Sequence, residues 1–444
     1  MVFVVVLIVV VALLAGVHRY LWRRFVGDTT APGTVLRRLG TVAAFVLPLL
    51  SVGALVSGQA GAPFWVQRVL AWPGYLWLAC LLYLTLALLV GEAARPLLRR
   101  VLDRRRPERA AEGTAESAGA DAAPAAENLA RGSTDALVPS GATARTATPE
   151  PATLEPAAPV VAAPVPASPG PSRRLFVARA VGGAAAVAGF GTVGYGTYGV
   201  LRGPRTKRIT VPLARLPRSA HGFRIAVVSD IHLGPILGHA HTRRVVDSIN
   251  ATRPDLIAVV GDLVDGSVAD LGYAAEPLAD LEARHGSFFV TGNHEYFSGA
   301  AEWVDHVREL GLHPLENARV EIDGFDLAGV NDVAGESEGQ GPDFDRALGD
   351  RDPARAAVLM AHQPVVIDDA VAHGVDLQLS GHTHGGQLWP GNLVAELANP
   401  TVAGLERYGD TQLYVSRGAG AWGPPVRVGA PSDITVVELA SRQA

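Results

Sequence analysis

The pattern of hydrophobic and polar positions differs between two parts of the chain. Three long apolar runs fall within the first hundred residues and a fourth ends at residue 201, whereas the rest alternates short apolar runs with Gly, Asp and His. A helix that crosses a bilayer needs about 20 predominantly apolar residues. We therefore predict membrane helices over Val2–Val17, Leu39–Gly58, Val69–Val90 and Val177–Leu201.

The charges beside these runs predict their orientation, because loops rich in Arg and Lys stay on the cytoplasmic side. Arg19–Arg38 and Arg95–Arg109 are rich in arginine, whereas Gln59–Gln67 contains no basic residue and is expected outside. The first run has arginines after it and none before it, which is the wrong polarity for a cleaved signal peptide. A fourth crossing then places everything after Arg202 outside the cell.

The same pattern defines four regions. Between the third and fourth runs the chain is rich in Ala, Pro, Glu and Thr, so it cannot bury enough apolar surface to fold. A poorly patterned helical domain is the alternative, and the recurrent proline argues against it. The predicted regions are a membrane region with three helices (1–106), a disordered linker (107–171), a fourth transmembrane segment (172–204) and a folded domain (205–444).

The fourth segment begins with a pattern found in export signals. Ser172-Arg173-Arg174-Leu175-Phe176 resembles the core of the twin-arginine signal, S-R-R-x-F, whose pathway carries folded proteins. The resemblance implies export of the following domain by a twin-arginine translocase; an ordinary fourth helix with a basic flank is the alternative. Ala186–Ala188 has the small residues of a cleavage site but lies within the apolar run, which favours retention as an anchor.

Composition narrows the classes of partner and site. The net charge of −5 argues against nucleic acid as a partner. Cys80 is the single cysteine, which excludes a disulfide framework and a cysteine-based zinc site.

Five short apolar runs of the C-terminal region each end in Asp, Asn or His. Helix-like spans such as Ala300–Gly311 and Pro277–Arg284 fall between them, so the predicted fold is α/β with largely parallel strands. Ligands of such sheets bind beyond the carboxyl ends of the strands. The residues at these ends are Asp230 and His232, then Asp262 and Asp265, then Asn293, His294 and Glu295, then His362, and finally His382 and His384.

These residue types indicate a metal centre. Carboxylate, amide oxygen and imidazole without thiolate suit Mn²⁺, Fe²⁺, Zn²⁺ or Co²⁺. The number of candidates exceeds what one tetrahedral zinc needs and matches two ions that share one carboxylate. Such a pair, about 3.5–4 Å apart, polarises a phosphoryl oxygen and lowers the pKa of a bridging water. The candidates are Asp230, His232, Asp262, Asn293, His362, His382 and His384.

The ordered motifs resemble the signature of the calcineurin-like metallophosphoesterases. They read Asp230-Ile231-His232, Gly261-Asp262-Leu263-Val264-Asp265, Gly292-Asn293-His294-Glu295, His362 and Gly381-His382-Thr383-His384. The resemblance covers roughly Phe223 to Leu439 and implies a two-sheet sandwich flanked by helices, with a dinuclear centre at the strand ends. The flanks GGQLWP and SRGAGAWGPPVR also resemble a bacterial membrane-associated branch whose members are often exported.

The resemblance also implies a role for each residue. One ion would be held by Asp230, His232 and His384, and the other by Asn293, His362 and His382, with Asp262 bridging them. His294 would not be a ligand; it would face the phosphate and protonate or stabilise the leaving oxygen. Asp265 would orient His294 and raise its basicity.

Together these features predict a phosphoesterase at the outer face of the cell membrane. It would hydrolyse phosphomonoesters, phosphodiesters or pyrophosphates by means of a hydroxide that bridges the two ions. The location favours a substrate linked to a lipid or the cell wall, with a nucleotide pyrophosphatase or a phosphoprotein phosphatase as alternatives. A sensory or binding module with a structural metal site is the competing class, although such a site has no need of His294.

Several further residues are candidates for a supporting role. Asn250 and Arg417 are expected to brace the site or touch substrate, and Trp389 and Trp422 either stack on substrate or pack their loops. His239 and His241 either line the entrance or have no function.

Overall fold

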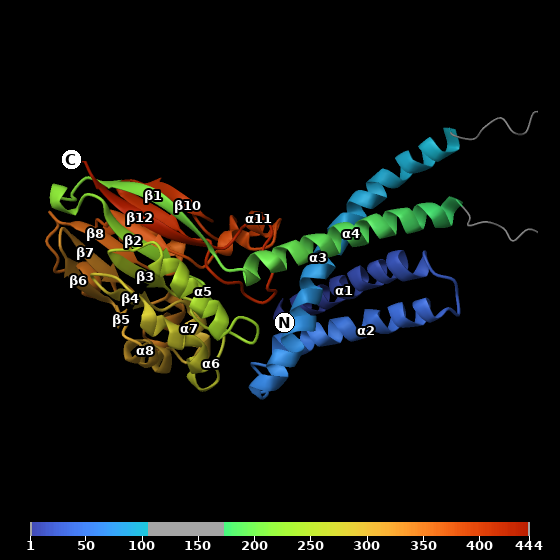
Figure 1. The fold of residues 1–444 in the computed structure, drawn as a ribbon, viewed down its shortest axis with the longest axis horizontal. Helices are drawn as coiled ribbons and strands as arrows, with labels where there is room; N and C mark the ends of the chain where they lie inside the picture. Colours follow the sequence, from blue (N-terminus) through green and yellow to red (C-terminus); the bar gives the residue numbers. More distant parts are fainter. Residues whose placement is uncertain (1, 105–172, 443–444) are drawn as a thin grey trace, which may run out of the picture.

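The computed structural model describes residues 2–104 and 173–442 of the 444-residue chain. Figure 1 shows a bundle of long helices with an α/β domain at one end of it. The predicted linker, 107–171, lies outside the described residues.

The bundle contains four helices that correspond to the four predicted apolar runs. Each is long and apolar enough to span a bilayer, which indicates association with a membrane. The helix of the third run continues into the basic stretch that follows it, because Arg and Leu are good helix formers. The helices are α1 (Val2–Trp22), α2 (Val35–Val56), α3 (Phe64–Arg104) and α4 (Arg173–Leu201), with a short π-helical turn η1 (Arg23–Gly27) after α1.

The domain is built on two six-stranded sheets. The strand order is β1-β12-β2-β3-β4-β5 in the first sheet and β10-β11-β9-β8-β7-β6 in the second. The first sheet contains β1 (Arg205–Leu213), β2 (Phe223–Val228), β3 (Leu256–Val260), β4 (Ser287–Val290), β5 (His313–Pro314) and β12 (Asp433–Ser441). The second contains β6 (Ala318–Ile322), β7 (Phe325–Gly329), β8 (Ala356–Met360), β9 (Leu377–Ser380), β10 (Gly404–Tyr408) and β11 (Thr411–Val415).

Most neighbouring strands are parallel, as predicted. Antiparallel pairs occur between β12 and β2, between β10 and β11, and between β6 and β7. The central strands are buried along their whole length, because parallel strands are covered on both faces. The two sheets pack face to face; for example, the rings of Phe223 and Phe325 meet edge to face with centroids 5.1 Å apart.

Helices cover the outer faces of both sheets and complete the predicted sandwich. Val246 and Trp303 pack on the first sheet, and Phe344 and Ile367 pack on the second. The helices are α5 (His239–Asn250), α6 (Val268–Ala275), α7 (Asn293–Ser298), α8 (Ala300–Glu309), α9 (Phe344–Leu348), α10 (Ile367–Ala372) and α11 (Gly391–Ala395). Short turns are η2 (Arg218–Ala220), η3 (Glu276–Asp280), η4 (Val333–Glu338), η5 (Pro364–Val366) and η6 (His384–Gly386).

One predicted helix is wrong. The span Pro277–Arg284 forms only the short turn η3 and then an irregular segment. Helix α6 ends just before it, because Pro277 lacks the backbone N–H and its ring obstructs a continuing helix.

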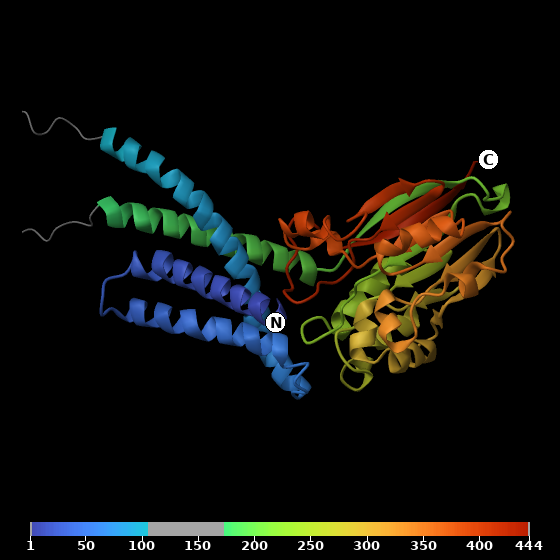
Figure 2. The same ribbon diagram turned by 180° about the vertical axis from the view of Figure 1, so that it is seen from behind.

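The domain contacts the bundle through its C-terminal loops (Figures 1 and 2). The hydroxyl of Tyr83 on α3 donates to the carbonyl of Trp389 at 2.9 Å. Val426 is fully buried in a cluster with side chains of α3 and α4, and Leu388 and Val428 pack against the same cluster. Gly196 on α4 permits this approach, because a Cβ there would lie 2.7 Å from Val426.

Candidate metal centre

The nine predicted site residues converge at the carboxyl ends of five strands. The loops after β2, β3 and β4 come from the first sheet, and the loops after β8 and β9 come from the second. Candidate ligand atoms from these loops form three overlapping groups, and within each group the atoms lie within 4.8 Å of one another. The groups are Asp230, His232 and His384; His232, Asp262 and His294; and Asp262, His362 and His382.

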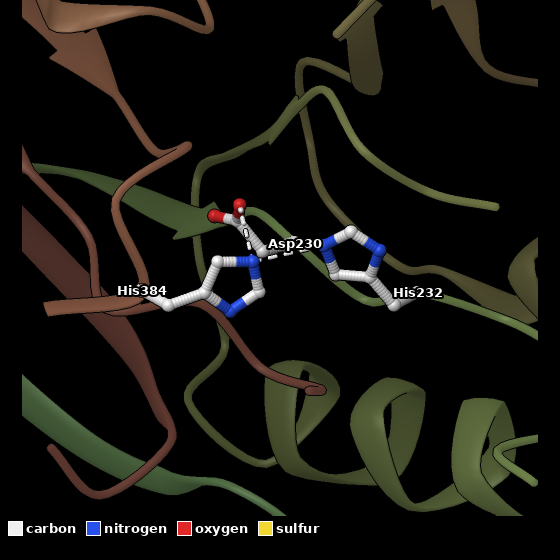
Figure 3. Close-up of side chains that lie close together, drawn as sticks. All are labelled: Asp230, His232 and His384. Carbon is white, nitrogen blue, oxygen red and sulfur yellow. Dashed lines mark hydrogen bonds and ion pairs between the residues drawn. The ribbon is translucent and has the colours of Figure 1, made fainter. Parts of the chain in front are cut away.

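The first group joins the loops after β2 and β9. Figure 3 shows the carboxylate of Asp230 and the rings of His232 and His384 turned toward one another. The two Nε2 atoms of His232 and His384 are 3.0 Å apart, and Nε2 of His384 is 3.4 Å from Oδ1 of Asp230. All three residues are buried.

The third group joins the loops after β3, β8 and β9. Oδ2 of Asp262 lies 3.1 Å from Nε2 of His362 and 3.7 Å from Nε2 of His232, so Asp262 lies between the two groups. Nδ1 of His382 is 3.0 Å from Oδ1 of Asn293, which brings the amide of Asn293 to the same place.

His294 belongs to the second group and is supported by Asp265. Nδ1 of His294 is 2.7 Å from Oδ1 of Asp265, and the same oxygen is 2.9 Å from Nδ1 of His232. Asp265 therefore supports a candidate ligand as well as His294, a contact that the sequence did not predict.

The backbone is strained at the candidate ligands. Positive φ angles, which are uncommon outside glycine, occur at Asp230 (51°), His232 (48°), Asp262 (52°), His382 (71°) and His384 (53°). Each such residue costs about 1–3 kcal/mol and persists only where the surrounding structure holds it. Gly292 contributes space, because a Cβ there would collide with the Asp262 carboxylate.

Glu295 holds two of the ligand loops together. It is fully buried and accepts hydrogen bonds from the backbone N–H groups of Asp262 (3.0 Å), Leu263 (2.7 Å) and Gly292 (2.6 Å). Burial raises the pKa of Glu295 to about 7, and the charge of Asp262 adds to this shift. The sequence analysis located Glu295 at the end of a strand but assigned it no role. The feature that could have indicated one is an acidic residue that closely follows a buried strand.

Arg427 braces the loop that carries His384. The guanidinium is buried and donates to the carbonyls of Gly420 (2.7 Å), His384 (3.1 Å) and Ala430 (3.1 Å), and its Nη2 lies 3.0 Å from Nδ1 of His384. Burial lowers its pKa to about 10, so it remains a cation. Sequence reasoning assigned it no role, because the contact joins positions far apart in the chain.

The remaining candidates are divided between the site and other surfaces. Asn250 is not at the site; its side chain bonds the backbone of Asp280 and Glu282 at the end of α5. Arg417 lies close to the site. Its Cγ would be 3.0 Å from a Cβ added to Gly385, the residue that follows His384.

Two further histidines of α5 differ in their surroundings. His239 stacks on Tyr273 with centroids 4.7 Å apart, whereas His241 is buried.

Electrostatics at the site reflect closely packed carboxylates. Burial alone lowers the pKa of His232, but Asp265, Asp262 and Asp230 together raise it to about 9. Burial lowers the pKa of His382 to about 4. Burial opposes the charged form of Asp265, yet His232 and His294 hold its pKa at about 2.

The residues present fit divalent metal ions. His362 illustrates this, because its Nδ1 is fixed on the carbonyl of Val260 at 2.9 Å, which leaves its buried Nε2 facing Oδ2 of Asp262 at 3.1 Å. An Nε2 that points at Asp262 in this way is placed as a ligand. Carboxylate, amide and imidazole donors without thiolate suit Mn²⁺, Fe²⁺, Zn²⁺ or Co²⁺.

Two exposed aromatic rings flank His294. The centroids of Phe297 and Trp422 each lie 5.6 Å from the imidazole, in edge-to-face arrangements. Both rings are largely exposed, so they form an apolar margin beside His294.

Comparison with known proteins gives a consistent result. The family model described as calcineurin-like phosphoesterase matches residues 223–386. A transmembrane protein with metallophosphoesterase domain from Danio rerio is 36% identical over 259 residues, which cover 55% of this chain and 59% of that relative's length. Uncharacterized metallophosphoesterases from Helicobacter pylori and Aquifex aeolicus are 37% and 34% identical, covering 55% and 53% of this chain and 66% and 91% of theirs.

Proposed function

This chain belongs to the calcineurin-like metallophosphoesterases, and from that premise we propose that it is a membrane-anchored, metal-dependent hydrolase of phosphate esters. The convergence of three overlapping groups of Asp and His donors, one of which includes His294, carries the proposal. The substrate class includes phosphomonoesters, phosphodiesters and pyrophosphates.

The candidate ligands would hold two ions. Such ions, when bound, neutralise charge on a phosphoryl group and lower the pKa of water. Asp262 suits the shared position because it lies between the two groups. One ion would be held by Asp230, His232 and His384, the other by Asn293, His362 and His382, and both by Asp262.

His294 would supply the proton that the leaving oxygen needs. Its Nδ1 is engaged by Asp265 at 2.7 Å, which leaves Nε2 to face the substrate. A histidine held in this way by a carboxylate is a more effective proton donor and acceptor. A purely structural metal site has no use for this pair, which favours an enzyme over a binding module.

We also place the domain outside the cell. The basic residues of the loops support this orientation, and the Arg173-Arg174 pair supports export by a twin-arginine translocase. Replacing both arginines by lysine should leave the domain inside, as measured by protease accessibility in intact spheroplasts. A domain that is still cleaved from outside would show that an ordinary fourth helix is sufficient.

The direct test uses the full chain in detergent, loaded with Mn²⁺ and assayed with bis(p-nitrophenyl) phosphate. We expect turnover, and a fall of about 10²–10⁴-fold in kcat for His294→Ala with the metal content unchanged. His373→Ala is the matched control, because His373 follows α10, where its half-buried ring stacks on Phe344, and belongs to none of the three candidate ligand groups. Wild-type protein that binds two ions per chain and hydrolyses nothing would identify a binding module.

A further inference from the structure

Helix α11 is attached directly to the loop that carries His382 and His384. A Cβ at Gly386 would collide with the backbone of Asn392 on α11, so the two segments touch. The hydroxyl of Thr383, between the two histidines, donates to the carbonyl of Val402 at 2.6 Å. The position of α11 is therefore fixed relative to the metal centre.

This segment presents a cluster of apolar side chains to its surroundings. Exposed fractions are between 53% and 88% for the four residues Trp389, Leu393, Val394 and Leu397, which we name the α11 surface. Single exposed apolar residues are common, but several within nine positions mark an interaction site.

The α11 surface is continuous with the bundle. Figures 1 and 2 both show α11 beside the end of α4 that faces the domain. The carbonyl of Trp389 accepts from Tyr83 of α3, and Leu388, one residue earlier, packs among side chains of the bundle. A bilayer around the bundle would meet this surface at its interface, where Trp and Leu side chains are favoured.

Gln387 links the α11 surface to the loop of Trp422, which lies beside His294. The side chain of Gln387 donates to the carbonyls of Trp422 (2.9 Å) and Pro424 (3.1 Å) and accepts from the N–H of Trp422 (3.0 Å). Gln387 thus ties the Trp422 loop to the segment that begins the α11 surface. The Trp422 ring in turn lies against His294.

We propose that the α11 surface inserts into the interface of the bilayer that surrounds the bundle, and that the substrate is the phosphate ester of an amphiphile held in that bilayer. The second half rests on the proposed hydrolase function. Water would add its oxygen to phosphorus while the ester P–O bond breaks, and the released oxygen would take a proton from His294. The apolar part of the substrate would lie along Trp422.

Membrane insertion is tested by spin labelling, which does not depend on activity. Cys80 is the single cysteine, so a full-length Cys80→Ala chain accepts one nitroxide at Val394→Cys or Leu397→Cys. Val371→Cys is the control; Val371 lies on α10 against Gly409, at the end of β10 away from α11. In phosphatidylcholine nanodiscs, we expect collisions with oxygen to exceed those with Ni-EDDA several-fold at 394 and 397 only. Water-like values at both sites would overturn the insertion.

The substrate class is tested with two phosphodiesters that share a leaving group, methyl and dodecyl p-nitrophenyl phosphate. We expect the nanodisc-embedded protein to prefer the dodecyl ester by at least about tenfold in kcat/KM, and Leu393→Ser/Val394→Ser to remove most of that preference. Val371→Ser should keep it. Equal rates for the two esters in the wild type would overturn the amphiphile assignment, whereas hydrolysis of neither would contradict the hydrolase function and leave the spin-label result standing.

Discussion

The metal centre and the α11 surface are close together in the chain but differ in burial and polarity. His384 and most of the other candidate ligands are buried polar groups, whereas Trp389 and Leu397 are exposed apolar groups only a few residues further on. The metal centre draws on five loops from two sheets, while the α11 surface comes from one short segment.

This difference shows where each region finds its partners. A buried polar group is costly unless another group of the fold satisfies it, so the metal centre is determined within the domain. An exposed apolar side chain is removed from water only when something outside the fold covers it, and here that is the bilayer. The two regions should therefore be separable by substitution.

The largest effect is expected for Asp262→Asn. Asp262 lies between both ligand groups, so its loss should release both ions and reduce kcat/KM by more than about 10³-fold. Metal content by mass spectrometry and turnover of the methyl ester measure this. The oxygen and Ni-EDDA accessibilities at residue 394 should not change; a change there would show that the two regions are not independent.

A smaller effect is expected for Asp265→Asn. It removes the carboxylate that supports both His294 and His232, so we expect a loss of about 10- to 100-fold in kcat/KM. Turnover of the methyl ester measures this loss, and metal content by mass spectrometry shows whether it arises through the candidate ligand His232 or through His294. Ser267→Ala, in the same loop, is the matched control. An unchanged kcat/KM would show that neither histidine depends on Asp265.

Sequence and structure agree best where a residue directly follows a buried strand. Asp230, Asp262 and His382 were predicted on that basis, because strand ends in such a fold must meet at one edge. Arg427 and the double contact of Asp265 were missed, because they depend on how loops from different sheets approach one another. The α11 surface was missed for another reason: five helical residues have no periodicity from which to predict a helix.

His241 is an exception to the rule that buried polar groups form hydrogen bonds. Its ring is buried on α5, and neither nitrogen has a hydrogen-bond partner among the described residues. Burial, with the charges of Arg244 and Arg427, lowers its pKa from 6.5 to about 3. Between about pH 6.5 and pH 3, His241 therefore binds a proton in the unfolded chain but not in the folded chain. The free energy of unfolding falls as the pH falls across that window.

Replacement of this residue should remove that pH dependence. Between pH 7.5 and pH 5 the wild type should lose about 2 kcal/mol more unfolding free energy than His241→Phe. Denaturant unfolding of the full chain in one detergent at both pH values measures the difference. Because the ligand histidines are common to both proteins, their protonation cancels. Equal losses would show that His241 is protonated in the folded chain.

A matched pair of substitutions applies one chemical change to both regions, and the smallest effect of all is expected at its α11 member, Val394. Val259 is fully buried on β3, next to the last residue of the strand that leads to Asp262. Val259→Ser should lower the free energy of unfolding by about 2–4 kcal/mol, because it removes apolar burial and places a hydroxyl in the core. Val394→Ser on the α11 surface should change the unfolding free energy by less than about 0.5 kcal/mol in detergent. A large loss at Val394 would mean that protein, such as a second copy of the chain, covers the α11 surface instead of lipid.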